Sequence, residues 1–309
     1  MMPFFIKLKD ILLFFWNHLY NIGITFVDCV YFSRDYFVKN CFVAPNVLSV
    51  KDTIQKIFES GLSVARYGDG EIKLCKDINL GFQKADTALC TRLRNILANN
   101  EDGLLVCVPG VFGDLDIYME HDRKHWTKHL AYYRRVWYKY MDRNKQYGEA
   151  FISRFYMPYK DKSVAFQAVE LWKQVWADRD LLIVEGEKSR LGVGNDLFDN
   201  ARSIKRILAP NKEAYSYYDR LIAEIKKYDS SHMVLLALGP TATVMAVDLC
   251  KLGFQAIDIG HIDIEYEWMK MNADHKVPIN NKFVNEAGGY NGDEYYQNQD
   301  YESQIVCRF

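Results

Sequence analysis

The sequence lacks an excess of charge of either sign. Its 309 residues carry 39 lysines and arginines against 40 aspartates and glutamates, a formal net charge of -1. Proteins that grip nucleic acid through its phosphates are usually basic over the binding surface. The balance therefore gives no electrostatic reason to expect a nucleic-acid partner.

The cysteine patterns of a disulfide framework or a zinc–thiolate site are also missing. The seven cysteines are an odd number, are widely spaced and include no Cys-x-x-Cys pair. Small secreted domains and zinc ribbons show the opposite pattern. We therefore expect reduced thiols in a cytoplasmic protein, and the N-terminus shows no cleavable secretion signal.

No uninterrupted apolar run approaches the roughly 20 residues that a membrane-spanning helix needs. The N-terminus comes nearest, but charged residues such as Lys9 and Asp10 interrupt it. Residues 4–38 instead predict one or two amphipathic helices, within an N-terminal extension over 1–47. Such helices could pack on the main domain, pair in a homodimer, or lie peripherally on the inner face of the membrane.

The rest of the chain alternates strand-like and helix-like segments. Several strand candidates are nearly continuous apolar runs, as expected for strands covered on both faces. This alternation predicts an α/β protein with a Rossmann-like, doubly wound, mostly parallel sheet over 48–285. The polar segment 286–309 predicts a loose or surface-hugging tail. The predicted strands are 62–67, 104–109, 181–186, 204–209, 233–239 and 254–260; the predicted helices are 50–60, 86–98, 114–140, 163–177, 212–227 and 241–252.

In such a sheet, ligands bind beyond the carboxyl ends of the strands. The first predicted strand runs into "RYGDGE", which contains Arg66, Gly68, Asp69 and Glu71. Two carboxylates separated by one glycine can aim at a single point, and such hard oxygen ligands suit Mg²⁺ or Mn²⁺. The alternative is an Asp-Gly turn with Glu71 in the first helical turn, where the helix dipole favours acids. Spacing alone leaves both interpretations open.

The strand at 181–186 is followed by a charged, glycine-containing loop with Glu187, Lys188, Arg190 and Asn195. Lysine and arginine at a strand end can neutralise a diphosphate, and glycines let the backbone approach it. The alternative is an ordinary charged loop with a helix cap at Asn195. The combination favours a ligand-binding loop.

A helix start with an open N-terminus follows the strand at 233–239. It consists of Gly239, Pro240, Thr241 and Ala242. Free backbone N–H groups at such a position bind anions. The segment is neither a Walker loop nor a Gly-x-Gly-x-x-Gly motif, so taken alone it fits a plain βα turn better.

His261, Asp263 and Glu265 alternate after the strand at 254–260 and could share one face of an extended segment. Such a face could supply a general base, or it could be the solvated side of an edge strand. The segment "SRFYMPY" adds Arg154, which could contact an anion beside tyrosines that contact a sugar or base.

The segment "HDRKH" imitates a zinc-protease helix, with His121, His125 and His129 four residues apart. A catalytic zinc site needs a third ligand and a shielded position. Lysines and arginines surround these histidines in the sequence. The pattern therefore favours a solvated basic helix face over a metalloprotease.

Five blocks together resemble the GT-D type glycosyltransferases, a bacterial family, and they follow the family's order along the chain. They are "RYGDGE", "SRFY", "VEGEKSRLGVGNDLF", "ALGPTATVMAVDL" and "DIGHIDIEYEW". The resemblance covers about residues 48–285. It implies a Rossmann-like domain that transfers glucose or another hexose from a UDP-sugar, using a metal at a DXE motif, here Asp69-Gly70-Glu71.

On this resemblance we expect Asp69 and Glu71 to hold Mn²⁺ or Mg²⁺. Asp263, Glu265 and His261 are the acid–base candidates. The acceptor could be a glycan, a glycoprotein or a lipid-linked oligosaccharide. Two alternatives stay open: a non-catalytic nucleotide- or sugar-binding module in polysaccharide assembly, and a metal-dependent phosphohydrolase. The expected donor-binding residues are Arg66, Gly68, Arg154, Glu187, Lys188, Arg190, Asn195, Gly239, Pro240, Thr241 and Ala242.

Overall fold

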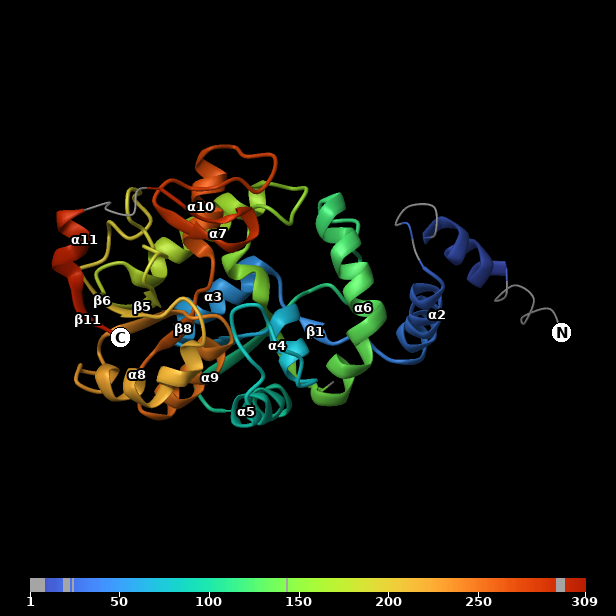
Figure 1. Cartoon of the computed structure of the whole chain (residues 1–309), viewed down its shortest axis with the longest axis horizontal. Coiled ribbons are helices and arrows are strands. Elements are labelled where there is room, and N and C mark those ends of the chain that lie inside the picture. Colours follow the sequence, from blue (N-terminus) through green and yellow to red (C-terminus); the bar gives the residue numbers. More distant parts are fainter. Residues whose placement is uncertain (1–8, 19–22, 24, 100, 143, 293–297) are drawn as a thin grey trace.

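A parallel sheet forms the centre of the protein (Figure 1). The computed structural model describes residues 9–18, 23, 25–99, 101–142, 144–292 and 298–309. Within them the sheet has nine strands in the order β1-β4-β3-β2-β8-β7-β5-β6-β11, and its strand pairs are parallel. The predicted α/β class is confirmed. The strands are β1 (Asn46–Val47), β2 (Ser63–Arg66), β3 (Leu104–Val108), β4 (Gln146–Glu149), β5 (Asp180–Gly186), β6 (Ser203–Ala209), β7 (Met233–Ala237), β8 (Ala256–Asp258) and β11 (Ile305–Arg308).

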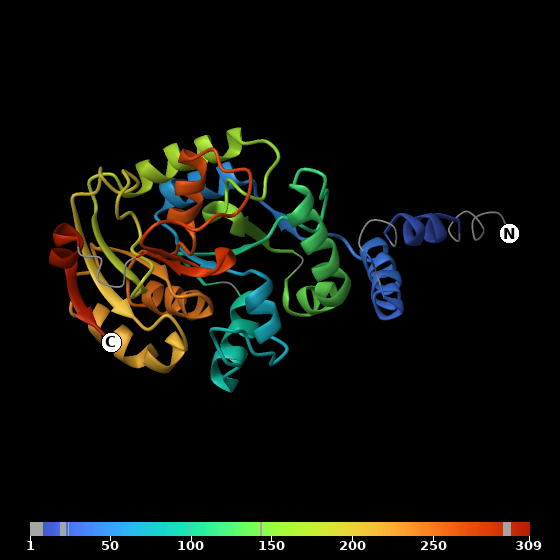
Figure 2. The same ribbon diagram turned by 45° about the horizontal axis from the view of Figure 1, so that its top comes forward.

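Helices cover both faces of the sheet, with α3, α7 and α10 on one face and α5, α8 and α9 on the other (Figures 1 and 2). The reason is visible in β5, whose successive side chains point to opposite faces. Leu181 and Ile183 join one apolar core, and Leu182 and Val184 join the other. The helices are α2 (Phe26–Cys41), α3 (Val50–Ser60), α4 (Asp69–Leu74), α5 (Thr87–Ala98), α6 (Glu120–Tyr140), α7 (Ser163–Trp176), α8 (Tyr218–Ile225), α9 (Pro240–Lys251), α10 (Ile262–Lys270) and α11 (Gln299–Gln304).

Short 3₁₀ turns and a two-stranded ribbon complete the fold. The turns are η1 (Ala150–Ser153), η2 (Ala214–Tyr217) and η3 (Asn285–Ala287). The ribbon pairs β9 (Lys282–Val284) with β10 (Gly289–Asn291) in antiparallel fashion, and η3 forms its tip. The segment 282–291 is called the β9–β10 hairpin below.

Local signals explain several helix ends. Ser49 caps α3 by accepting the N–H of Asp52 at 3.0 Å, and Gly61 closes that helix in the left-handed conformation. Asp86 caps α5 through the N–H groups of two residues. Side-chain caps and C-terminal glycines are the commonest helix boundaries. The predicted helix at 86–98 therefore begins within one residue of its expected position.

The structure corrects the prediction of a loose C-terminal tail. The helix α11 and the strand β11 fold onto the domain, and β11 pairs with β6 as the last strand of the sheet. Phe309 packs against the core beneath it. The predicted domain bounds at 48 and 285 thus cut through the structure, since β1 and β11 both belong to the sheet.

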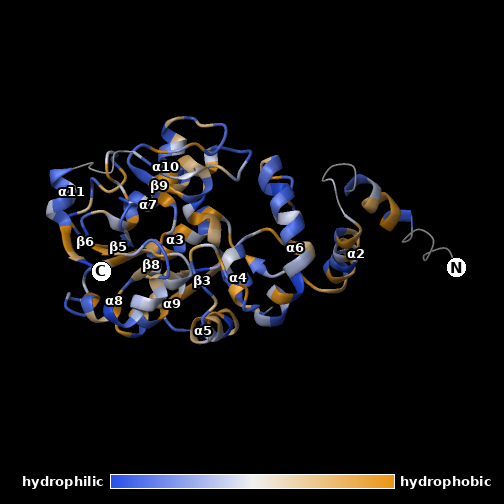
Figure 3. Ribbon diagram, in the orientation of Figure 1, coloured by the Kyte–Doolittle hydropathy of each residue, from blue (hydrophilic) through white to orange (hydrophobic). Residues whose placement is uncertain are grey.

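The N-terminal helices lie at the end of the molecule opposite β11 (Figures 1 and 2). Residues 9–18 are helical, and α2 packs on α6 through an Arg134–Asp35 ion pair of 2.6 Å. Hydrophobic residues occur on both helices (Figure 3), and Trp16 and Phe26 are 72% and 84% exposed. The described residues contain no helix long and apolar enough to cross a membrane. The rest of the predicted segment, residues 4–8, 19–22 and 24, lies outside the described residues.

Candidate active site

The central strands β2 and β8 end side by side, and Arg66 joins them. Its Nε donates to the carbonyl oxygen of Asp258 at 2.7 Å, and a terminal nitrogen donates to Asp258 Oδ1 at 2.8 Å. The other terminal nitrogen donates to the Ala150 carbonyl at 3.2 Å. A Cβ at Gly260 would lie 2.0 Å from this guanidinium, so only glycine fits there. Arg66, predicted to bind the donor, is committed to holding three strand ends together.

The predicted metal pair lies in the first turn of α4, directly beyond β2. Glu71 Oε2 accepts the N–H of Gly68 at 2.7 Å, so Gly68 and Glu71 close this turn. Burial raises the pKa of Glu71 to about 7, and the negative charges of Asp258 and Asp69 add to the rise. The surroundings of Glu71 therefore disfavour its ionised form, and a nearby cation would stabilise it.

Asp69 has two basic neighbours. Its Oδ2 accepts a 2.6 Å hydrogen bond from Lys73, one helical turn further on, and lies 4.0 Å from Nε2 of His125. Burial pushes the pKa of Asp69 upward, but the hydrogen bond and charge of Lys73 outweigh it, so the net shift is downward. Asp69 is therefore ionised at neutral pH.

The structure also corrects the prediction for "HDRKH". His121 and His125 are exposed as predicted, at 79% and 44% of the side chain, but His129 points into the core. His129 is buried, its Nε2 accepts the indole N–H of Trp137 at 3.1 Å, and burial lowers its pKa to about 3. The spacing of four residues indicated that these histidines share one side of the helix. It could not show that His125 lies beside Asp69.

The residues present fit a divalent metal that is shared with a substrate. Among the described residues, no group of three or more His, Cys, Asp and Glu side chains is placed to hold a metal alone. Mg²⁺ and Mn²⁺ at nucleotide sites commonly take one or two carboxylates and complete their shell with water and phosphate oxygens. Asp69 and Glu71 supply two such carboxylates on one turn, and the uncompensated Glu71 favours a cation.

A second charged cluster unites Arg154, His261 and Glu286. Arg154 donates to Glu286 Oε1 at 2.5 Å, and His261 Nε2 lies 3.8 Å from Glu286 Oε2. The three side chains are 23–31% exposed, so a ligand can reach them. Burial lowers the pKa of Arg154, but the charges of Glu286, Glu265 and Asp69 outweigh that effect, so the net shift is upward. Glu286 escaped prediction because it falls in the segment expected to be a tail.

Two of the three predicted acid–base residues are built into the scaffold. The segment after β8 is the helix α10, so the prediction of an extended segment with alternating faces was wrong. Asp263 accepts from Lys282 Nζ at 2.7 Å and from Asn195 Nδ2 at 2.7 Å. Glu265 Oε2 accepts the N–H groups of Tyr156 and Met157 at 2.9 and 2.8 Å. Asp263 and Glu265 are 1% and 0% exposed, and these hydrogen bonds to the scaffold favour a structural role for both.

The loop after β5 faces the β9–β10 hairpin. Lys188 lies over the ring of Tyr290, 4.7 Å from its centroid, and Arg190 donates to the carbonyl of Asn281 at 2.7 Å. The strands β8 and β7 stand between β2 and β5, a separation of about 14 Å at the usual strand spacing. Lys188 and Arg190 therefore start well away from Asp69. Glu187 is exposed, and Asn195 is held by Asp263 and Glu267.

The start of α9 packs closely on the end of β2. Thr243 Oγ1 donates to the carbonyl of Arg66 at 2.9 Å, while Pro240, Thr241 and Ala242 are buried. Gly239 alone in this turn is exposed; its φ is +55°, and a Cβ there would lie 2.9 Å from the Phe82 ring. Of the predicted anion-binding helix start at 239–242, only Gly239 is therefore exposed to a ligand.

Comparison with known proteins shows what this fold and site resemble. Residues 64–287 match the family described as "Glycosyltransferase GT-D fold". The chain is 41% identical over 263 residues to "Probable glycosyl transferase Gly" of Streptococcus gordonii, and 40% identical over 263 residues to "Glycosyltransferase GlyD" of Streptococcus pneumoniae. Each match covers 85% of this chain but only 38% and 32% of the relatives, so the chain spans about a third of their length.

Two solved structures agree. "A New Glycosyltransferase (DUF1792) from Streptococcus sanguinis" is 39% identical with a TM-score of 0.82, covering 86% of this chain and 100% of that one. A structure described as "The highly conserved domain of unknown function 1792 has a distinct glycosyltransferase fold" is 40% identical with a TM-score of 0.84, covering 89% and 99%. The fold is that of a glycosyltransferase. The chain belongs to the GT-D family.

Proposed function

We propose that this chain is a metal-dependent glycosyltransferase that moves a hexose from a UDP-sugar to a glycan or glycoconjugate acceptor, with glucose as the first candidate sugar. The observation that carries the proposal is the Asp69–Glu71 pair at the end of the central strand β2, with Arg154 near enough for the charge of Asp69 to contribute to its raised pKa. The glycosyltransferase names of relatives at about 40% identity support the reaction class.

The leaving diphosphate gains negative charge as the sugar departs, and the site can offset that charge. Asp69 and Glu71 would hold Mn²⁺ or Mg²⁺, which would supply positive charge to the diphosphate oxygens. Arg154 would add a guanidinium, because it already lies within the field of Asp69. The exposed backbone of Gly239 would approach the donor from α9. Lys188 and Arg190 could contact only a more distant part of the donor.

His261 is the acid–base candidate that the geometry retains. Burial and the nearby charge of Arg154 lower its pKa to about 4, so the ring is neutral at pH 7 and can accept a proton. Glu286, 3.8 Å from Nε2, would stabilise the imidazolium once it forms. We propose that His261 accepts the proton of the acceptor hydroxyl as that hydroxyl attacks the sugar.

The apolar N-terminal helices support a contact outside the sugar-transfer site. Besides Trp16 and Phe26, Phe37 is 56% exposed, on the side of α2 away from Asp35 and α6. We propose that these helices make a peripheral membrane contact, as a lipid-linked acceptor would require. The alternative is that a second copy of the chain covers them in a homodimer. The proposed location is the cytoplasm.

One experiment tests the reaction class. The protein is incubated with UDP-glucose, other UDP-hexoses and other nucleotide-sugars, with Mn²⁺ or with a chelator, and release of the nucleoside diphosphate is followed. We expect Mn²⁺-dependent release of UDP from one UDP-hexose. Binding without turnover would indicate the non-catalytic module, whereas release of phosphate from simple phosphoesters would indicate the phosphohydrolase.

A further inference from the structure

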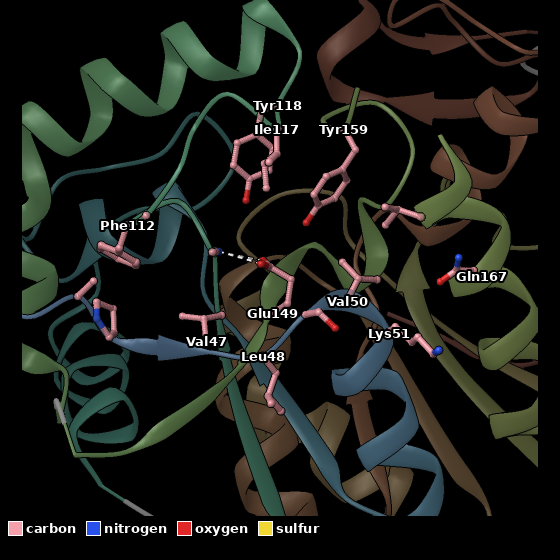
Figure 4. Close-up of a pocket in the computed structure, with 16 residues that line it drawn as sticks. Val47, Leu48, Val50, Lys51, Phe112, Ile117, Tyr118, Glu149, Tyr159 and Gln167 are labelled. Carbon is pink, nitrogen blue, oxygen red and sulfur yellow. Dashed lines mark hydrogen bonds between the residues drawn. The ribbon is translucent and has the colours of Figure 1, made fainter. Parts of the chain in front are cut away.

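A cavity of about 600 Å³ opens at the edge of the sheet, beyond the strands β1, β3 and β4 (Figure 4). It lies outside the Asp69 and Arg154 clusters and shares no residue with them. Its volume is in the range of small-molecule sites, which are largely apolar with a few placed polar groups. Its lining residues are Ala44, Pro45, Val47, Leu48, Ser49, Val50, Lys51, Gly110, Phe112, Gly113, Ile117, Tyr118, Glu149, Tyr159, Val164 and Gln167.

A buried carboxyl group forms the floor of this cavity. Glu149, the last residue of β4, is 4% exposed. Its carboxylate accepts the N–H of Gly110 at 3.0 Å and the N–H of Phe151 at 3.1 Å. A Cβ at Gly110 would lie 2.3 Å from Glu149 Oε2, so glycine is what admits the carboxylate. Among the described residues Glu149 forms no ion pair, and buried acids with a raised pKa often lie at functional sites.

Two tyrosine hydroxyls face the same floor. Tyr118 and Tyr159 are bridged through their backbones, and their ring centroids lie 5.2 Å apart. Figure 4 shows both hydroxyl groups directed toward Glu149. The rings are 1% and 7% exposed, so their orientation is fixed by packing. Three oxygen-bearing side chains therefore converge between apolar walls.

This chemistry selects the ligand class. The one cation among the lining residues, Lys51, is exposed and lies away from Glu149 in Figure 4, so the floor offers no positive charge to a phosphate or a carboxylate. A wholly apolar ligand would use none of the three polar side chains. A neutral sugar ring satisfies both conditions: its hydroxyls can bond with Glu149, Tyr118 and Tyr159, and its C–H face can lie on aromatic and aliphatic side chains.

The cavity and the candidate active site both lie beyond the carboxyl ends of the strands. Arg66 of β2 is in register with Cys107 of β3, which pairs with Gly148 of β4. Glu149 is the next residue, so it lies roughly 10 Å from Arg66 at two strand spacings. Arg66 also donates to the carbonyl of Ala150, directly after Glu149. An extended glycan could reach both places.

We propose that this cavity binds a neutral sugar unit of the acceptor glycan, next to the unit that receives the hexose. The inference rests on the proposed function, and it names the substrate class and the residues that would recognise it.

Saturation-transfer NMR tests the proposal with three probes: glucose, galactose and N-acetylglucosamine. We expect one of them to bind the wild-type chain with a Kd of about 1 mM, a typical weak affinity. Tyr118→Phe and Tyr159→Phe should each weaken the signal about tenfold, and Val164→Phe should abolish it by filling the cavity. Tyr147→Phe is the matched control: this buried tyrosine is in β4, but its hydroxyl bonds to the Leu97 carbonyl, outside the cavity, so binding should persist.

Two results would overturn the proposal: no saturation transfer from any probe to the folded wild-type chain, or equal transfer in wild type and Val164→Phe. The same samples are assayed for UDP-hexose turnover. Turnover without sugar binding would defeat the cavity assignment alone. Sugar binding at the cavity without turnover of any UDP-hexose would defeat the proposed function and leave a carbohydrate site in place.

Discussion

Arg154 and Glu286 lie 132 residues apart in the chain and form a 2.5 Å ion pair. The pair joins the segment after β4 to η3 at the tip of the β9–β10 hairpin. The same hairpin reaches Asp263 through Lys282. It therefore links the cluster of Arg154, His261 and Glu286 to the buried scaffold of α10.

The Arg154–Glu286 pair should matter for turnover more than for folding. Glu286→Gln removes the charge that positions Arg154 and would stabilise a protonated His261. We expect kcat for UDP-hexose turnover to fall at least tenfold, with the melting temperature nearly unchanged because the pair is partly exposed. Glu302→Gln is the control, since Glu302 pairs with Arg308 on the exposed C-terminal segment. Equal activity of the Glu286 variant and the control would contradict the assignment.

Asp263 should behave as a structural residue. Its ion pair with Lys282 is buried on both sides, so Asp263→Asn leaves a lysine without its main partner. We expect a loss of about 3–5 kcal/mol in the free energy of unfolding. Chemical denaturation measures it, and Lys282→Met in the same chain should restore part of the loss. A fully stable but inactive Asp263→Asn protein would instead return Asp263 to the catalytic residues.

Glu149 should give folding a pH dependence. Burial raises its pKa from 4.5 to about 8, against the opposing hydrogen bonds of Phe151 and Gly110. The unfolded chain releases this proton more readily, so the stabilisation is complete below about pH 4.5 and is lost as the pH rises to about 8. The titratable groups facing it are Tyr118 and Tyr159, which stay protonated in this range.

Calorimetric melting temperatures across this pH range test the assignment. Glu149→Gln should flatten the decline, by an amount corresponding to a few kcal/mol. The remaining slope should come from the other buried acids whose pKa is raised, which are Glu71, Glu185, Asp258 and Glu265. Identical slopes in wild type and variant would show that Glu149 is ionised in the folded protein.

The exposed apolar helices should bind anionic membranes. Trp16→Ser together with Phe26→Ser removes two of the most exposed aromatic side chains. Sedimentation with phosphatidylglycerol vesicles should bring down the wild-type chain and not the variant, because buried apolar area drives such binding. If the wild-type chain stays in the supernatant and elutes as a dimer that the substitutions dissociate, a second copy covers this surface instead.

Much of the fold follows from local sequence patterns. The buried strands β5 and β7 are nearly continuous apolar runs, and these runs alone located them in the sequence. The strands β1 and β4 contain only two and four residues, the latter "QYGE", and such short polar strands form only because neighbours pair with them. The strand β11 was missed for a different reason: it is four residues long and follows a polar segment, which favours a loose tail.

The candidate site was less predictable, because sequence gives residue types at strand ends without their partners. Asp69 and Glu71 lie directly beyond β2, as the sequence predicted, and their role as metal ligands stays a prediction. Asp263 and Glu265 were misassigned because "HIDIEYEW" alternates like a strand, although it folds as a helix whose acids pair inward. Glu286 carries no motif, and only the hairpin brings it to His261.

The central claim is that Asp69 and Glu71 hold the metal, and Mn²⁺ binding measured by electron paramagnetic resonance tests it most directly. With UDP present, wild type should bind one Mn²⁺ per chain. Asp69→Asn and Glu71→Gln should each weaken that binding at least tenfold while the protein stays folded, because each removes a charged ligand. Lys73→Met, which removes the neighbour of Asp69 but no ligand, should still bind Mn²⁺. Unchanged Mn²⁺ affinity in both carboxylate variants would contradict the account.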